Sequence, residues 1–456
     1  MKIFNYFHLE ENNTNFKTEV YSGISVFLAL LPTLIINSVI LSEAGMNSFG
    51  VYIATALTAG ILTILIGVFT NSPYAMISGI GINTFFVYTS VYVFQDWRFS
   101  ILSTIVFGII YFLITILHYG KKLFTEFPEN LKQALVIGIG IFILENGLED
   151  IGVITYYPHI ITFFNIPFEI SFIGLNTIHA LFSPINLIVI LGIALILILM
   201  KYEIKTSFII GMLFIYIITI ILELAGFHLT DYTVIPNEII KLGITTHLNQ
   251  VFFKLPDLTK LYNVDFLVNF ILATIMMYFI VFFDILSTTM ALTTKSGKEI
   301  DNINAFSHIC SLGQILGGII GTSPNIVAIE NYVGILNGCK TGLTSVIIGL
   351  MFLISVFFSP FVFSIPVFVI TPVFFVVSYL MIKDITKISR EISELIPSLV
   401  IILIILATGS LINGLMFGVI AYVLVKLIFK KKEDITKITW ALFVIFIILF
   451  VLNSFF

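Results

Sequence analysis

Apolar stretches of membrane-spanning length follow one another along almost the whole chain. A helix that crosses a membrane needs about 17–25 mostly apolar residues. Twelve uninterrupted stretches meet or approach this length, at 20–41, 51–69, 99–118, 134–152, 185–200, 207–225, 264–292, 304–320, 342–359, 361–382, 395–412 and 413–430. The chain is 59% hydrophobic and 11% charged, with a mean hydropathy of +1.10, which excludes a soluble domain with a large core. The sequence predicts an all-α polytopic membrane protein.

Two further apolar segments, 72–93 and 322–340, are interrupted by glycine, proline and asparagine. They bring the expected number of spans to about fourteen, and a last apolar stretch at 438–456 can either span or lie against the bundle. Seven spans separate the two interrupted segments, an odd number, so the two halves of the chain would be inverted. Paired interruptions at matching places indicate an inverted-repeat transporter with its site at the interruptions.

The lysine and arginine residues support this number of spans. With a cytoplasmic N-terminus, 18 of the 22 fall in cytoplasmic segments, and the outside holds only Arg98, Lys241, Lys254 and Lys260. The positive-inside rule predicts such an excess. We therefore expect a multi-pass protein of the cell membrane with a cytoplasmic N-terminus and an external loop at 226–263.

The second interrupted segment carries a carboxylate, Glu330, at expected membrane depth. A charge in hydrocarbon costs several kcal/mol unless it is paired or faces a polar cavity, so it indicates a functional site. Pro324 has no N–H and disfavours helix at Ser323. We expect an extended piece at 326–329, with helix resuming near Tyr332. The alternative is a plain kink in which Glu330 pairs with a neighbouring helix.

The first interrupted segment has a similar composition. Pro73 stops a helix on its N-terminal side, and Gly79 and Gly81 allow close approach or unusual dihedrals. Asn83 is then expected at the start of a half-helix, where free N–H groups face the break. Close helix packing by small residues is the alternative, and it explains the glycines but not Asn83.

A second carboxylate, Asp284, is expected deep within the eighth span. It follows about twenty apolar residues, and Thr288 lies one turn later on the same helix face. The alternative is that Asp284 ends its helix and that Thr288 bonds back to its own backbone.

The remaining polar residues near the span ends are expected to have supporting roles. Glu145, Glu149 and Asp150, at the end of the fifth span, and Glu223, at the end of the seventh, are placed where interface or gate residues occur, and a solvated mouth is the favoured interpretation. His308 can act as a proton relay, although a hydrogen-bonded packing histidine is the favoured interpretation.

Several classes of function are disfavoured. Cys310 and Cys339 provide neither a disulfide framework nor a metal-ligand spacing. The chain has no basic run for nucleic acid, no phosphate-binding loop for ATP and no ordered signal peptide at its start. We therefore expect no cofactor, no metal and no nucleic-acid partner.

Eight short motifs occur in a characteristic order. They are KTEVxxGI from Lys17, LSEAGM from Leu41, GIGINTFF from Gly79, Phe283-Asp284, GTS from Gly321, Glu330, KTGLT from Lys340 and FFSP from Phe357. Each is weak alone, but together they resemble the azaguanine-type hypoxanthine/guanine/adenine permeases. That family is a branch of the nucleobase–cation symporters related to the uracil and xanthine permeases.

The resemblance implies fourteen spans in a seven-plus-seven inverted repeat, with short β-strands in spans 3 and 10. A core domain would comprise 20–118 and 264–360, and a gate domain 134–225 and 361–430, with 438–456 as an extra C-terminal segment. The substrate would lie between the two strands and span 8. The resemblance also implies proton symport and an elevator-type movement, with a homodimer as an open possibility.

Carried over motif by motif, the resemblance implies a substrate site formed by Glu330, Asp284, Asn83, Thr288, Ile329, Ala328 and Gly81. Glu330 is assigned to the base, and Asp284 jointly to the base and the proton, with Glu330 contributing to proton coupling. A carboxylate in a low-dielectric site holds its proton more tightly, which suits a proton carrier. Na⁺ remains the alternative coupling ion.

Three positions depart from the family pattern. The run 29–32 reads Ala-Leu-Leu-Pro where a Thr-Met-Ala-Tyr-like run is usual, and Ile285 replaces a usual threonine. Residues 326–328 read Ile-Val-Ala where a Thr-Ser-Tyr-like run is usual. All three replace polar or aromatic groups near the expected pocket, so they bear on which base is bound.

The leading hypothesis is a proton-driven secondary transporter of a purine-like nucleobase. A flat amide-bearing ring presents adjacent N–H donors, which a carboxylate accepts. The alternatives are the same fold carrying another solute or an anion, and a channel or non-transporting receptor. An intramembrane aspartyl protease is disfavoured, because only Asp284 lies deep and no Gly-x-Gly-Asp occurs.

Overall fold

The structure is a computed structural model of the 456-residue chain. It describes residues 6–79, 82–83, 85–116, 126–163, 166–175, 183–202, 206–227 and 244–452, with the single positions 204, 229, 235, 238 and 240. The chain divides into two compact units. Unit 1 comprises 1–120, 219–285 and 298–366, and unit 2 comprises 121–218, 286–297 and 367–456.

Unit 1 contains both interrupted segments. Its elements are α2 (Phe16–Glu43), α3 (Ser48–Thr70), β1 (Met76–Ser78), the π-helical η1 (Phe85–Val91), α5 (Tyr92–Phe94), α6 (Trp97–Ile116), α12 (Ile244–Leu248), η2 (Leu258–Tyr262), α14 (Ile303–Ile320), β4 (Asn325–Val327), α15 (Asn331–Asn337), α16 (Gly342–Ser355) and α17 (Ser359–Ser364). Helix α13 (Val264–Ser296) begins in unit 1 and ends in unit 2.

Unit 2 is a separate helical bundle with one β-hairpin. Its elements are α8 (Glu129–Asp150), β2 (Ile154–Phe163), β3 (Ile166–Leu175), α10 (Pro184–Lys201), most of α11 (Ser207–Leu224), η3 (Val367–Val369), α18 (Thr371–Ile382), η4 (Lys383–Lys387), α19 (Ile392–Thr408), α20 (Leu411–Ile428), η5 (Lys432–Asp434) and α21 (Lys437–Leu452). Within this unit α8 packs against α18 and α19, and α20 packs against α19 and α21.

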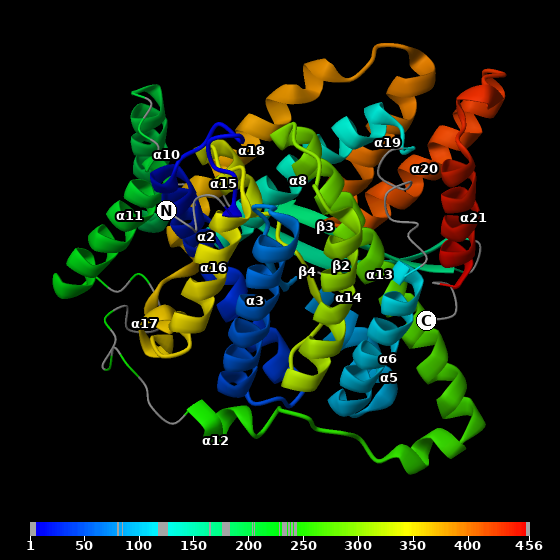
Figure 1. The fold of residues 1–456 in the computed structure, drawn as a ribbon, viewed down its shortest axis with the longest axis horizontal. Helices are drawn as coiled ribbons and strands as arrows, with labels where there is room; N and C mark the ends of the chain where they lie inside the picture. Colours follow the sequence, from blue (N-terminus) through cyan, green and yellow to red (C-terminus); the bar gives the residue numbers. More distant parts are fainter. Residues whose placement is uncertain are drawn as a thin grey trace. The chain divides into compact units, whose positions relative to one another are not determined.

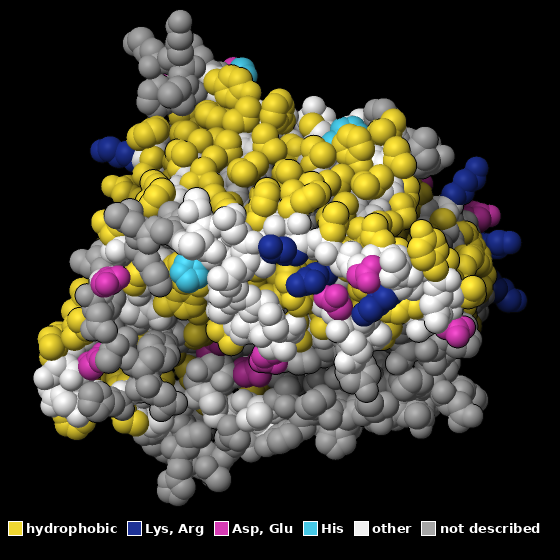
Figure 2. All heavy atoms as spheres, turned by 90° about the horizontal axis from the view of Figure 1, so that it is seen from below, with side chains coloured by type: hydrophobic (Ala, Val, Ile, Leu, Met, Phe, Trp, Pro, Cys, Tyr) yellow, Lys and Arg dark blue, Asp and Glu magenta, His cyan; other side chains and the backbone are white. Residues whose placement is uncertain are grey.

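The described helices confirm a polytopic membrane protein. Eight of them are long and apolar enough to cross a membrane: α2, α3, α6, α8, α10, α11, α13 and α14. Figure 2 shows hydrophobic side chains covering a broad area of one face, with charged side chains gathered in a strip beside it. A water-exposed surface rarely carries so large an apolar patch, whereas a lipid-facing surface requires one.

Two parts of the chain differ from the predicted spans. Residues 154–163 and 166–175 form two antiparallel strands, in which Ile154 pairs with Leu175 and Phe163 with Ile166, whereas the sequence predicts no element there. The predicted continuous span at 361–382 is wrong, because Pro366 and Pro372 divide it. Proline lacks the N–H that a helix interior needs but is accepted in a first turn, and α18 begins next to Pro372.

Helices α3 and α16 pack closely and antiparallel in unit 1, through two pairs of facing glycines (Figure 1). A Cβ atom added at Gly349 would lie 2.6 Å from the carbonyl oxygen of Gly60, and one added at Gly342 would overlap the carbonyl of Gly67. Small residues allow such close approach, which replaces the hydrophobic effect as the source of helix association in lipid.

Replacing Gly342 by alanine should therefore push α3 and α16 apart. Overpacking of this kind costs about 1–3 kcal/mol, so we expect a clearly lower melting temperature in detergent. Gly147→Ala is the matched control, since its added Cβ would meet Phe374 Cβ at 3.3 Å and the ring of Phe375 at 3.5 Å. Equal melting temperatures for the Gly342 variant and the unmodified protein would show that the two helices separate at little cost.

Residues 244–253, which begin with α12, form a strap across the ends of α3 and α14 in unit 1 (Figure 1). The N–H of Phe253 donates to the carbonyl of Ile319 at 2.8 Å. Gly321, with φ +101°, has room only because it lacks a Cβ, which would lie 2.5 Å from the carbonyl oxygen of Val251. The strap thereby fixes the residue from which the chain turns out of α14 toward β4.

Candidate functional site

The two interrupted segments meet as a pair of short strands. β1 and β4 are antiparallel, with Met76 opposite Val327, Ile77 opposite Ile326 and Ser78 opposite Asn325. This confirms the short strands expected in spans 3 and 10, with β4 ending at Val327, two residues before the end of the extended piece expected at 326–329. Because hydrocarbon offers no water to bond a free backbone, such strands must find every partner within the protein.

Side chains from the preceding helices satisfy the outer edges of both strands. On α3, Thr63 Oγ1 accepts from the N–H of Met76 at 3.1 Å and donates to its carbonyl at 3.4 Å. On α14, Gln314 Oε1 accepts from the N–H of Asn325 at 3.0 Å, while Nε2 donates to its carbonyl at 2.6 Å. In each half of the chain, one helix side chain therefore bonds both the N–H and the carbonyl of a single strand residue.

Asn331 extends the ladder beyond the strands. Its Oδ1 accepts from the N–H of Ala75 at 2.8 Å, and its Nδ2 donates to the carbonyls of Ala75 at 3.0 Å and Ala328 at 2.8 Å. None of Thr63, Gln314 and Asn331 is among the residues predicted for the site. Their signal was a polar side chain within an apolar span next to a break, which is costly unless it has a partner.

Glu330 lies at the end of this strand pair, directly before α15, and is half-buried. Its Oε1 accepts a hydrogen bond of 2.9 Å from Thr33 Oγ1 on α2. Thr33, which is 6% exposed, was not among the predicted site residues. Within the described part of the chain, Glu330 is bonded to a hydroxyl and not paired with a cation, so the carboxylate keeps acceptor capacity for a ligand.

Asn83 is fully buried at the crossing of the strands. Its Oδ1 accepts from Ser78 Oγ at 2.8 Å and from Ser323 Oγ at 2.5 Å. Asn37 Oδ1, 3.2 Å from Ser323 Oγ, is an alternative acceptor for the same proton. Asn83 therefore holds the end of β1 to the start of the β4 segment, and its direct contact with a substrate stays a prediction. Gly81 lies outside the described residues.

Asp284 and Thr288 both lie within the continuous helix α13. Asp284 is 9% exposed and belongs to unit 1, whereas Thr288 is buried in the part of α13 that belongs to unit 2. Beside β4, Ala328 is buried and Ile329 is half-buried. Unit 1 therefore carries Glu330, Asp284 and Asn83 together, and their sharing one cavity stays a prediction.

The supporting residues fall into two groups. His308 Nδ1 lies 2.8 Å from Thr115 Oγ1, an arrangement typical of a packing histidine. Of the expected solvated mouth, Glu149 is exposed, but Glu145 is buried. The expectation of a solvated position is therefore wrong for Glu145, which is 3% exposed.

The sequence matches the model of the Permease family of the xanthine/uracil type over residues 17–415. Similar proteins include a protein of Methanocaldococcus jannaschii described as a permease (28% identity, 91% of this chain and 90% of that protein). The guanine/hypoxanthine permease PbuG of Bacillus subtilis is 26% identical over 92% of both chains. The adenine permease AdeP of Escherichia coli is 27% identical over 90% of this chain and 87% of its own.

Solved structures with a similar fold are also transporters. The transmembrane domain of the cyanobacterial bicarbonate transporter BicA superposes with a TM-score of 0.55 at 16% identity, covering 90% of this chain and 97% of that domain. The murine anion transporter Slc26a9 in its inward-facing state has a TM-score of 0.55 at 12% identity, covering 91% of this chain and 69% of its own. These likenesses concern the fold alone, and they confirm the predicted fold class.

Proposed function

Because this chain belongs to the xanthine/uracil permease family, whose model it matches over residues 17–415, we propose that it carries a purine-like nucleobase across a membrane. It is a membrane transporter rather than an enzyme. The relatives named as guanine/hypoxanthine and adenine permeases match at least 87% of both chains. This extent supports a purine as the class of substrate.

The observation that carries the proposal is the position of Glu330 at the end of the paired strands, with a hydroxyl as its partner. A purine base presents ring and exocyclic N–H groups along one edge. A carboxylate is an acceptor with two oxygens, so it matches such an edge by charge-assisted hydrogen bonds. The rigid strand pair beside it supplies a fixed frame against which a flat ring can be oriented.

Proton coupling is the finer part of the proposal. Asp284 lies within the apolar helix α13, and it is largely buried. A buried carboxylate near the substrate takes up and releases a proton with changes in its surroundings. Asp284 is therefore assigned to the base and the proton together. Transport then proceeds by an elevator-type movement of a core domain that carries both carboxylates.

A carried anion is the second candidate, because the fold neighbours transport bicarbonate and other anions. Two carboxylates, Glu330 and Asp284, oppose an anionic substrate in the same unit. Like charges in a low-dielectric site repel strongly, so a neutral base with N–H donors suits this site better.

The test is uptake by purified protein in liposomes. Labelled adenine, guanine and hypoxanthine should accumulate when the external medium is more acidic than the interior, and an uncoupler should abolish the accumulation. Separate arms replace the proton gradient by a Na⁺ gradient and the base by bicarbonate, with protein-free liposomes as the control. Accumulation of bicarbonate but of no base would refute the proposed substrate, and base uptake driven only by Na⁺ would refute the proposed coupling ion.

A further inference from the structure

The hydrogen bond between Thr33 and Glu330 connects α2 to the proposed substrate site. We propose that Thr33 is a positioning residue, whose hydroxyl fixes the orientation of the Glu330 carboxylate and so makes α2 part of substrate recognition. This inference rests on the proposed function and adds a determinant of affinity to it. The run 29–32 immediately before Thr33 is one of the places where this chain departs from the family pattern.

Contacts at both ends fix the position of α15 on α2. At one end Asn337 Nδ2 donates to Ser25 Oγ at 2.9 Å. A Cβ added at Gly334 would lie 2.8 Å from Val26 Cγ2, so this glycine lets the helices approach closely. At the other end, Thr33 Oγ1 donates to Glu330 Oε1 at 2.9 Å. The two helices thus run antiparallel, and Thr33 is the residue of α2 that reaches the carboxylate.

The hydroxyl of Thr33 is used differently from most threonine hydroxyls in helices. Such a group usually bonds back to the carbonyl four residues earlier, as Thr58 does to Ala54 at 2.7 Å. A hydroxyl has a single proton, and that of Thr33 is donated to Glu330. The preceding residue, Pro32, lies inside α2 and removes one N–H from its ladder.

The bond has a direct consequence for ligand binding. A carboxylate on a flexible glutamate side chain samples several orientations, and ordering such a side chain has an entropic cost that is otherwise met on binding. Thr33 holds Oε1 in place before the ligand arrives, so that Oε2 faces a defined direction. Because the acceptor is a carboxylate, the bond belongs to the stronger, charge-assisted class.

The test compares Thr33→Val, which keeps the shape and removes the hydroxyl, with Thr33→Ser, which keeps the hydroxyl. Thr33→Val should raise the Kd for the best-bound purine and the KM for its uptake about tenfold, the effect of losing one hydrogen bond to a charged group. The maximal uptake rate should change much less. Thr33→Ser should stay within about twofold of the unmodified protein, a difference of less than 0.5 kcal/mol.

Thr58→Val is the matched control, since it removes a buried hydroxyl that bonds only to its own helix. It should leave Kd and KM unchanged. Melting temperatures of all variants are recorded, and Thr33→Ala replaces the valine variant if that variant is unstable. A loss of affinity that follows the loss of thermal stability in both Thr33 variants, or that Thr33→Ser does not rescue, would overturn the positioning role.

Glu330→Gln separates this inference from the proposed function. If Thr33→Val binds purines as the unmodified protein does while Glu330→Gln has lost binding, the role of Thr33 is refuted and the site stands. If Glu330→Gln also binds normally, both the site and the role of Thr33 fall.

Discussion

Glu330→Gln is expected to abolish substrate binding, with a loss of at least about 100-fold in affinity, because two charge-assisted hydrogen bonds to the base would contribute roughly 1.5–3 kcal/mol each. Glutamine has the same shape and can still accept from Thr33, whose bond to Oε1 measures 2.9 Å. It replaces the second oxygen by an NH₂ group, however, so that this NH₂ donor faces an N–H donor of the base. Equilibrium binding of labelled bases to the purified variant measures the effect.

Asp284→Asn provides the contrast to this variant. Asp284 is assigned to the proton as well as the base, so its amide should weaken uptake more than binding and flatten the dependence of uptake on pH. The measurement is the pH profile of uptake beside that of binding. If either carboxylate can be replaced by its amide with uptake and its pH profile intact, that carboxylate is structural.

The second large effect, a loss of stability in unit 2, is expected on replacing Lys426. Its side chain is only 2% exposed and lies between two carboxylates, with Nζ 2.5 Å from Glu394 and 2.7 Å from Asp434. Asn130 Nδ2 donates to the other oxygen of Glu394 at 3.1 Å. The cluster therefore ties the ends of α8, α19 and α20 to the segment that precedes α21.

A surface ion pair flanks this buried cluster. Lys431 pairs with Glu391, which directly precedes α19, and this hydrogen bond holds the pKa of Glu391 below its ordinary value. Glu391 therefore stabilises the folded state when ionised, and that contribution is lost as the pH falls through its pKa in the folded protein. Because both side chains are well exposed, the pair is expected to matter little.

Lys426→Met should destabilise unit 2 severely. Methionine keeps the length of the side chain, but Glu394 is left as a buried charge without its cation. Removing one partner of a buried ion pair costs about 3–5 kcal/mol, and we expect the lower end of this range because Asp434 is 50% exposed and can turn to water. The melting temperature of the purified protein in detergent measures the loss.

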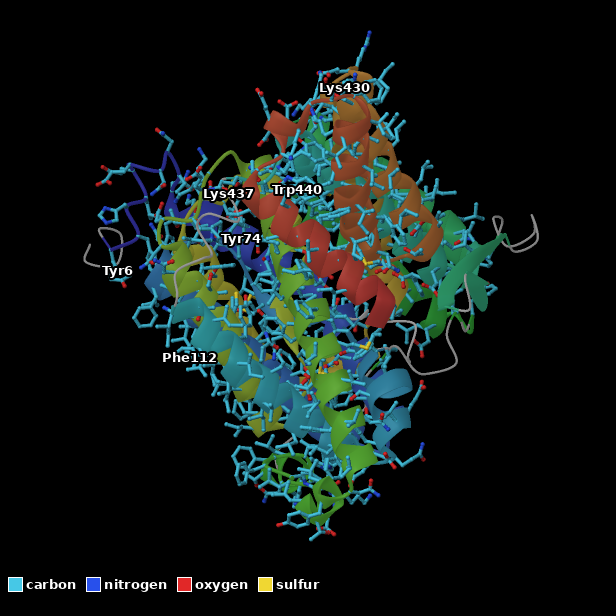
Figure 3. All side chains as sticks on the ribbon, turned by 90° about the vertical axis from the view of Figure 1, so that its right-hand side faces the viewer. Tyr6, Tyr74, Phe112, Lys430, Lys437 and Trp440 are labelled. Atoms are coloured by element: carbon cyan, nitrogen blue, oxygen red, sulfur yellow. The ribbon has the colours of Figure 1, made fainter. Side chains whose placement is uncertain are left out.

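The matched control is Lys437→Met. Figure 3 labels Lys437 at the beginning of α21 and Lys430 just beyond the end of α20. Lys437 is exposed, so its replacement should leave the melting temperature nearly unchanged. Similar melting temperatures for both variants would contradict a stabilising role of the buried lysine. A double variant, Lys426→Met with Glu394→Gln, should recover part of the loss, because it also removes the stranded charge.

The sequence by itself determined the class of fold and the two carboxylates. Long apolar stretches have few stable solutions in a membrane, and a charge within one is costly enough to be rare without a function. For that reason Glu330 and Asp284 could be found without a structure. The breaks before β1 and β4 could be found as well, because Pro73 and Pro324 remove backbone donors locally.

The tertiary structure alone decided which partners these residues have. Thr33 and Glu330 are 297 positions apart, and a threonine in a helix has a local carbonyl as an equally good partner. Lys426 looked like one more cytoplasmic lysine, although it is buried between carboxylates of two segments. The strands at 154–163 and 166–175 were not predicted, because strand formation depends on neighbouring strands more than on intrinsic propensity. The sequence shows which residues are costly to place in hydrocarbon. Which distant residues become their partners is decided only when the helices pack.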